Sequence, residues 1–230
     1  MVERVDLSGR EPEWRGGAPV WPLAGAGAAG FFAGRGAPER DSAAIRALLP
    51  PGVAPAWLRQ VHGARLLAAR PGSCGEGDAL VVSAPGIAAL VATADCLPVL
   101  IAAPGEARAV HAGWRGLVAG VLGAALGEMA EPARATAWIG PAIGPCCYEV
   151  GDDVASAVVA ASAPAVLRRG PAGRPHLDLA AAAAEQLARA GVSRVVHLAL
   201  CTRCHGDRLW SHRRDREAAG RNLAAIWLEP

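Results

Sequence analysis

Short apolar runs alternate with glycine- and proline-rich breaks along most of the chain. In the middle of the sequence the runs at 78–83, 87–93, 97–102 and 107–111 follow one another closely. Several of them are apolar at successive positions, which is typical of strands that are covered on both faces of a sheet. The pattern therefore predicts a group of buried central strands in this region.

Further strands and helices are predicted on both sides of this group. The other predicted strands lie at 57–61, 135–139, 195–200, 209–212 and 223–228, and Phe31-Phe32 marks one more. The predicted helices are 43–49, which ends at Pro50-Pro51, 117–129, 152–161 with an acidic first turn, and 179–190, with Asp178 as N-cap and Gly191 as stop.

This alternation of strands and helices indicates an α/β protein. The sequence of 230 residues shows no internal repeat and no linker long enough to divide it. We therefore expect a single domain spanning residues 1–230, with a central mixed sheet or sheets flanked by helices.

The composition restricts the chemistry. Apolar residues make up 52% of the chain, its formal net charge is +2, and all 23 basic residues are arginine. The absence of lysine excludes a lysine Schiff base and a phosphate loop of the GxxxxGK[ST] type. Arginines cluster only at 213–216, so we expect no nucleic-acid partner.

The sequence predicts a cytoplasmic enzyme without a membrane anchor. Its first residues lack a basic segment followed by an apolar one, and no apolar run reaches the roughly 18 residues of a membrane span. In the cytosol the six cysteines are expected to be thiols or metal ligands.

Three residues form a candidate metal site. His62, Cys96 and His111 each lie at the edge of an apolar run, and their spacing is unlike that of a zinc finger. Two imidazoles and one thiolate suit zinc, and three protein ligands with an open position describe a catalytic site. Spacing alone leaves the alternative of a core cysteine and two ordinary polar histidines.

The segment that follows His111 is a candidate anion site. Gly113 and Gly116 flank Trp114 and Arg115 directly before a predicted helix. Backbone N–H groups at a helix start can bind phosphate, and Arg115 can add a bidentate contact. A plain strand–turn–helix connection with a surface arginine and a packing tryptophan is the alternative.

Four motifs in this order resemble the laccase-domain family, also called the multicopper polyphenol oxidase-like or peptidoglycan editing factor family. They are Gln60-Val61-His62-Gly63, Thr93-Ala94-Asp95-Cys96-Leu97-Pro98-Val99, His111-Ala112-Gly113-Trp114-Arg115-Gly116 and Gly140-Pro141-Ala142-Ile143-Gly144-Pro145-Cys146-Cys147-Tyr148-Glu149-Val150. The resemblance covers roughly residues 57 to 228 and includes Leu177-Asp178-Leu179, Cys201-Thr202-Arg203-Cys204 and Ser211-His212-Arg213-Arg214-Asp215. This chain departs from the family pattern in two places: its segment at 34–38 is short, and His212 stands where the family tends to have tyrosine.

The resemblance implies a zinc-dependent purine nucleoside phosphorylase. Such an enzyme would cleave adenosine, inosine, guanosine and methylthioadenosine with phosphate, and would also deaminate adenosine. The implied zinc ligands are again His62, Cys96 and His111, with copper as the less favoured metal.

We assign the remaining roles as hypotheses. Cys96 and His111 are the candidate catalytic residues, and Arg35, Gln60 and Arg115 the candidate substrate and phosphate contacts. Deamination by a metal-activated water also requires a carboxylate that moves protons, for which Asp95 and Asp78 are the candidates.

Other functions remain as alternatives. Cys96 activated by His62 or His111 would make a cysteine hydrolase that cleaves amides of peptidoglycan precursors. True laccase chemistry would require many histidines, usually in His-x-His pairs, and the six histidines here form none.

The remaining cysteines offer further readings. The run Cys201-Thr202-Arg203-Cys204-His205 matches the C-x-x-C-H haem attachment pattern, although no export signal accompanies it. A redox site or a second zinc site could combine Cys201 and Cys204 with Cys146 and Cys147. The simpler interpretation is that these are thiols that shape loops beside the pocket.

Overall fold

Two seven-stranded sheets form the framework of the protein. The computed structural model describes residues 3–7, 9–170 and 173–230. The first sheet has the strand order β1 (Glu3–Asp6), β15 (Arg194–His197), β12 (Thr136–Ile139), β10 (Leu97–Ala103), β11 (Glu106–Ala112), β8 (Ala79–Val82) and β6 (Leu66–Ala68). It is mixed, since β1, β15 and β12 are parallel whereas β12, β10, β11 and β8 are antiparallel.

The second sheet is also mixed and packs against the first. Its order is β2 (Glu13–Arg15), β3 (Ala18–Gly25), β4 (Ala28–Ala33), β16 (Asn222–Leu228), β9 (Ile87–Thr93), β5 (Ala54–Arg59) and β7 (Gly72–Glu76). One apolar cluster contains side chains of both sheets, among them Leu100 and Trp138 from the first and Phe32 and Val91 from the second. A separate two-stranded ribbon joins β13 (Leu167–Arg169) and β14 (Pro175–Leu177).

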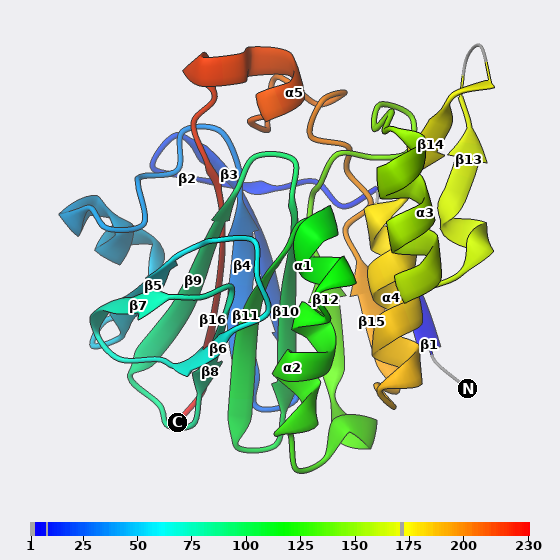
Figure 1. The fold of residues 1–230 in the computed structure, drawn as a ribbon. Helices are drawn as coiled ribbons and strands as arrows, with labels where there is room; N and C mark the ends of the chain where they lie inside the picture. The colour runs from blue at the N-terminus through cyan, green and yellow to red at the C-terminus, as the bar shows by residue number, and fades with distance from the viewer. Residues whose placement is uncertain (1–2, 8, 171–172) are drawn as a thin grey trace.

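Helices cover the outer face of the first sheet. They are α1 (Trp114–Val118), α2 (Val121–Gly127), α3 (Asp152–Ala161) and α4 (Leu179–Arg189). Of these, α2 contacts β11 and β8, and α4 contacts β12 and β15 (Figure 1). Their apolar sides share a buried cluster with that sheet. The outer face of the second sheet packs on the 3₁₀ turn η1 (Ala43–Leu48).

This arrangement confirms the predicted α/β class with mixed sheets and flanking helices. All four central strands are present, and every residue of β10 is buried, as expected for a strand covered on both faces. The N-cap of α4 is also confirmed, because the Asp178 carboxylate accepts a hydrogen bond from Ala181 N at 2.9 Å.

Two sequence predictions about elements were wrong. The helix expected at 117–129 is two helices, because Gly120 has φ 81° and separates α1 from α2. The segment 209–212 is not a strand: the Asn222 amide bonds both Trp210 N and Trp210 O, each at 2.9 Å. The Trp210 groups that a strand would pair are thus satisfied by one side chain, Ser211 N donates to the Asp215 carboxylate, and α5 (His212–Asp215) begins at the next residue.

None of the helices in the described part of the chain combines the length and the apolar character that crossing a bilayer requires.

Candidate functional site

The candidate site lies where the two sheets meet at one end. Strands β5 and β9 are parallel neighbours in the second sheet, so both end at the same edge. The chain then crosses to the first sheet at 94–96 and enters β10, whose start pairs with the end of β11. His62, Cys96 and His111 follow or lie on these strand ends, and they converge for that reason.

These three side chains, which we call the His/Cys group, can hold a metal ion. Their ligand atoms all lie within 4.8 Å of one another, and Cys96 Sγ is 3.8 Å from His62 Nε2. The two imidazole rings meet edge to face, with centroids 4.8 Å apart. His111 is only 3% exposed whereas His62 is exposed, so one side of the group is accessible.

Asp78 fixes the orientation of two members of the His/Cys group. This carboxylate is fully buried and lies 2.8 Å from His111 Nδ1, which leaves Nε2 as the ligand atom. It also accepts hydrogen bonds from His62 N at 2.9 Å and Gly63 N at 2.7 Å. Burial raises the pKa of Asp78, but the bonds from His111 and the two backbone groups outweigh it and lower the pKa below its usual value. Its oxygens are thus occupied in positioning the group, and the role of proton carrier does not suit it.

Without a metal, Cys96 and His111 favour a thiolate and an imidazolium. Burial raises the pKa of Cys96, but hydrogen bonds from His111 and His62 prevail and lower it to about 6. Burial lowers the pKa of His111, yet its bonds to Asp78 and Cys96 raise it to about 9. The sulfur is therefore in the form that binds a soft cation or attacks an electrophile.

Two residues at the His/Cys group, His62 itself and Asp95 directly before Cys96, adopt unusual backbone conformations. His62 has φ 61° and Asp95 has φ 88°, which non-glycine residues rarely adopt. The Asp95 carboxylate stabilises its turn by accepting bonds from Thr202 Oγ1 and Arg213 N, both at 2.6 Å. Asp95 thus holds the Cys96 turn, and both its oxygens are engaged, so it is a poor candidate for moving protons.

The glycine that follows β11 makes room for the His/Cys group. A Cβ atom on Gly113 would lie 2.9 Å from Cys96 Sγ and 3.2 Å from His62 Cδ2. We expect Gly113→Ala to push these ligands apart and to weaken metal binding about 10-fold, as for other changes that misplace a ligand. Metal titration checks this.

The matched control for that variant is Gly123→Ala in α2, where a Cβ meets no atom within 4 Å. This helical substitution is expected to leave metal affinity unchanged and to stabilise the fold by about 0.5–1 kcal/mol. Equal metal affinity in both variants would show that the close approach of Gly113 is unimportant.

A cavity of about 1050 Å³ opens beside the His/Cys group. Its wall contains all three members of the group and the aromatic rings of Trp114, Tyr148 and Trp210. Basic side chains predominate among its charged residues, which are Arg40, Arg59, Arg115, Arg213, Arg221, Glu39, Asp41 and Asp95. The cavity is large enough for a drug-sized ligand and combines aromatic surface with positive charge.

The predicted substrate contacts are only partly brought together. Gln60 and Arg115 line the cavity, but the Gln60 amide is already bonded to Arg40 Nη1 at 2.6 Å and to the backbone of Ala92. Arg35 is not among the residues that line it. Its guanidinium lies 3.6 Å from the centre of the Trp210 ring and 3.4 Å from the Asp215 carboxylate.

Sequence reasoning missed several residues of this wall. Tyr148 and Arg213 stood inside recognised motifs without an assigned role, whereas Arg40 and Arg221 carried no local signal. His212, the position that departs from the family pattern, also lines the cavity.

Known sequences resemble this chain over most of its length. Residues 39–229 match the family described as multi-copper polyphenol oxidoreductase laccase. The purine nucleoside phosphorylase YfiH of Escherichia coli strain K12 is 41% identical over 180 residues, covering 76% of this chain and 74% of that protein. The purine nucleoside phosphorylase SCO2081 of Streptomyces coelicolor is 44% identical over 193 residues, covering 77% and 78%.

Solved structures share the fold. Protein NMB0706 of Neisseria meningitidis superposes with a TM-score of 0.79 at 30% identity, covering 92% of this chain and 99% of that one. YlmD of Geobacillus stearothermophilus gives a TM-score of 0.75 at 27% identity, covering 93% and 92%. From the sequence match over residues 39–229, the chain belongs to the multi-copper polyphenol oxidoreductase laccase family.

Proposed function

We propose that this protein is a purine nucleoside phosphorylase that binds its nucleoside and phosphate in the cavity. The observation that carries the proposal is the His/Cys group in the wall of an arginine-rich, aromatic cavity. Relatives 39% to 44% identical to this chain bear the name purine nucleoside phosphorylase. We place the enzyme in the cytoplasm, where free thiols persist.

The metal that we propose for the His/Cys group is zinc. A tetrahedral zinc with one sulfur and one nitrogen ligand separates the two donors by about 3.5 Å, close to the 3.8 Å between Cys96 Sγ and His62 Nε2. A copper site of the same donor set usually adds a weak axial methionine. Met129 lies instead in the cluster under the helices. When bound, the ion supplies a Lewis acid at its open position.

Aromatic residues of the cavity suit the purine. Trp114 and Tyr148 present rings on which a base can stack. Burial, and then the negative charge of Cys96, raise the pKa of Tyr148 to about 12. Its hydroxyl therefore stays protonated and can donate a hydrogen bond to the base.

The arginines suit the phosphate. In phosphorolysis a phosphate oxygen forms a bond to the anomeric carbon of the sugar while the bond to the purine nitrogen breaks, and the purine leaves with a proton. Arg115 is exposed beside Trp114, with its guanidinium 4.5 Å from the ring centre. Together with Arg213, whose guanidinium is 5.4 Å from the Tyr148 ring centre, it can hold the dianion next to the base.

A substitution tests the phosphate assignment. Arg115→Gln is expected to raise the KM for phosphate about 10-fold, since a charge-assisted hydrogen bond contributes about 1.5–3 kcal/mol, while metal content stays unchanged. Initial rates at varied phosphate measure this. The control is Arg134→Gln, whose guanidinium is exposed and pairs with Glu131 on the surface. An unchanged KM in the Arg115 variant would remove this residue from the phosphate site.

The proposed function itself is tested with purified protein of known metal content. Adenosine, inosine, guanosine and methylthioadenosine are incubated with and without phosphate, and products are identified by mass spectrometry. Release of the base together with a sugar 1-phosphate, only when phosphate is present, is the expected result. Inosine from adenosine in the phosphate-free arm would add deaminase activity, and no turnover of any nucleoside would reject the proposal.

A cysteine hydrolase acting on peptidoglycan precursors is the second candidate, favoured by the short distance between Cys96 and His62. Alkylation distinguishes the two functions. A hydrolase would keep its amidase activity without metal and lose it on alkylation, whereas the phosphorylase requires the metal.

A further inference from the structure

Two loops outside the His/Cys group bring four cysteines together. Cys146 and Cys147 lie in the loop after β12, and Cys201 and Cys204 lie in the turn after β15. The two strands are parallel neighbours, so these loops leave the sheet at the same edge. They are also joined directly, because Thr202 N donates to Ala142 O at 2.9 Å.

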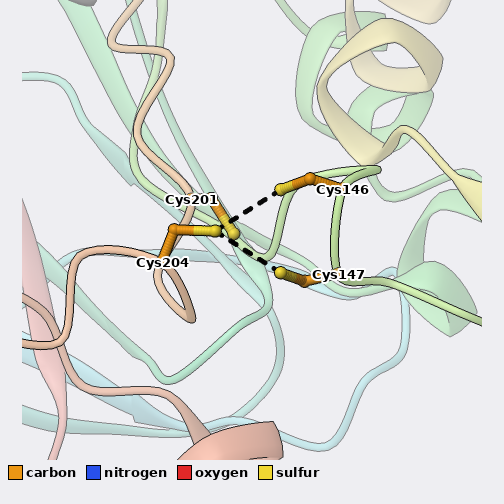
Figure 2. A group of neighbouring side chains, drawn as sticks. All are labelled: Cys146, Cys147, Cys201 and Cys204. Carbon is orange, nitrogen blue, oxygen red and sulfur yellow. Dashed lines mark hydrogen bonds between the residues drawn. The ribbon is translucent and has the colours of Figure 1, made fainter.

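We propose that Cys146, Cys147, Cys201 and Cys204, the four-cysteine cluster, bind a second zinc ion through four thiolates. Figure 2 shows their sulfur atoms turned toward a common centre. This second zinc site is separate from the metal site proposed for the His/Cys group, and either proposal can be correct without the other.

The sulfur distances match such an ion. Cys204 Sγ lies 3.7 Å from Cys146 Sγ and 3.4 Å from Cys147 Sγ, and all four sulfurs lie within 4.8 Å of one another. A zinc–sulfur bond of ~2.3 Å in a tetrahedron places sulfurs about 3.8 Å apart. A disulfide needs about 2.05 Å, and all four residues are free cysteines.

The spacing and the local contacts of these cysteines are typical of metal ligands. Cys201 and Cys204 have the two-residue separation of zinc-binding turns. Gly144 N donates to Cys201 Sγ at 3.3 Å, and a Cβ on Gly144 would lie only 3.3 Å from Cys146 Sγ. Four charged sulfurs at this spacing would repel one another strongly without a cation.

The surroundings also suit the charge of this site. Four thiolates and Zn²⁺ carry two net negative charges. The guanidinium of Arg214 donates to the carbonyls of Thr202 and Arg203, at 2.8 Å and 3.1 Å, between the two cysteines of this turn. This guanidinium is thus fixed beside the four-cysteine cluster, although its Nε and Nη2 also donate to the Asp215 carboxylate, which offsets part of its positive charge.

The role of this ion would be structural. Four protein ligands leave no open position for a substrate, unlike the three of the His/Cys group. The ion would fasten the loop after β12 to the turn after β15. Tyr148 follows Cys147 directly and lines the cavity, so the same ion would hold this part of the wall in place.

Metal analysis of the full-length protein tests the proposal. The protein is expressed with zinc, purified under reducing conditions, and its zinc per chain is measured by mass spectrometry. Cys204→Ser alters an exposed residue and is expected to lose one equivalent of zinc relative to wild type. Cys74→Ser is the matched control, since this buried cysteine belongs to neither group, and it is expected to lose none.

Cobalt substitution separates the two sites. The Cys96→Ser protein loaded with Co²⁺ is expected to keep a strong sulfur-to-cobalt charge-transfer band, which disappears when Cys204→Ser is added. Wild-type zinc content in the Cys204 variant, iron in place of zinc, or a disulfide within the cluster of the reduced, folded protein would overturn the proposal. If Cys96→Ser lost zinc but Cys204→Ser did not, the four-cysteine site would be contradicted and the His/Cys site would stand.

Discussion

Cys96→Ser is expected to lose one equivalent of metal per chain and to lower kcat/KM for nucleoside phosphorolysis by more than about 100-fold. A serine hydroxyl does not deprotonate at neutral pH as the Cys96 thiol does, and substitutions of supporting residues alone cost about 10–100-fold in metal affinity or activity. Cys96 supplies the only sulfur among the three ligands of the His/Cys group. Metal analysis and phosphate-dependent release of purine measure the two effects.

Alkylation of the metal-free wild-type protein distinguishes a metal ligand from a nucleophile at Cys96. If Cys96 were a nucleophile in a metal-independent hydrolase, the metal-free protein would keep an activity that alkylation removes. Cys74→Ser again serves as the control, with unchanged metal content and rate. Full activity with unchanged metal in the Cys96 variant would contradict the proposed site.

The His/Cys group was accessible from the sequence because its members mark the ends of apolar runs. Strands with parallel neighbours end at one edge of a sheet, and side chains placed there meet. The positions of His62 and Cys96 after β5 and β9 follow this rule. The sequence did not show that β5 and β9 belong to one sheet and β10 to another, since strand pairing depends on contacts far apart in the chain.

The supporting residues were harder to predict, because their roles depend on register and on rotamers. Asp78 reaches His111 only because β8 pairs with β11 in a particular register, in which Ala79 lies opposite Val110. One residue of slip would turn alternate side chains to the other face. Arg35 was predicted to contact the substrate, but it binds Trp210 and Asp215 instead. Both partners come from the far end of the sequence, so the local pattern around Arg35 does not show them.

The weakest predictions concerned the N-terminal part. Strand β3 contains Pro19 and Pro22 and many small residues, so it lacks the alternation that indicates a strand. It forms because β4 pairs with it on one side and β2 on the other, a tertiary effect that outweighs local preference.

Asp78→Asn is expected to weaken metal binding at the His/Cys group about 10–100-fold, the usual cost of removing the carboxylate behind a histidine ligand. The amide cannot accept from His111 Nδ1 and from the backbone of His62 and Gly63 at once, as the carboxylate does. The proton can then move to Nε2, the atom that the metal needs. Metal titration measures the affinity, and nitrogen NMR of the metal-loaded protein reports the His111 tautomer.

Asp178→Asn is the matched control for this variant. Asparagine caps helices about as well as aspartate, so this substitution at the start of α4 should change neither metal affinity nor fold stability appreciably. Asp78→Ala differs from both, because it leaves buried N–H donors unsatisfied at about 1–3 kcal/mol each and is expected to destabilise the fold. If Asp78→Asn lowered only the free energy of unfolding and left metal affinity and the His111 tautomer unchanged, Asp78 would be a structural residue and not a positioning one.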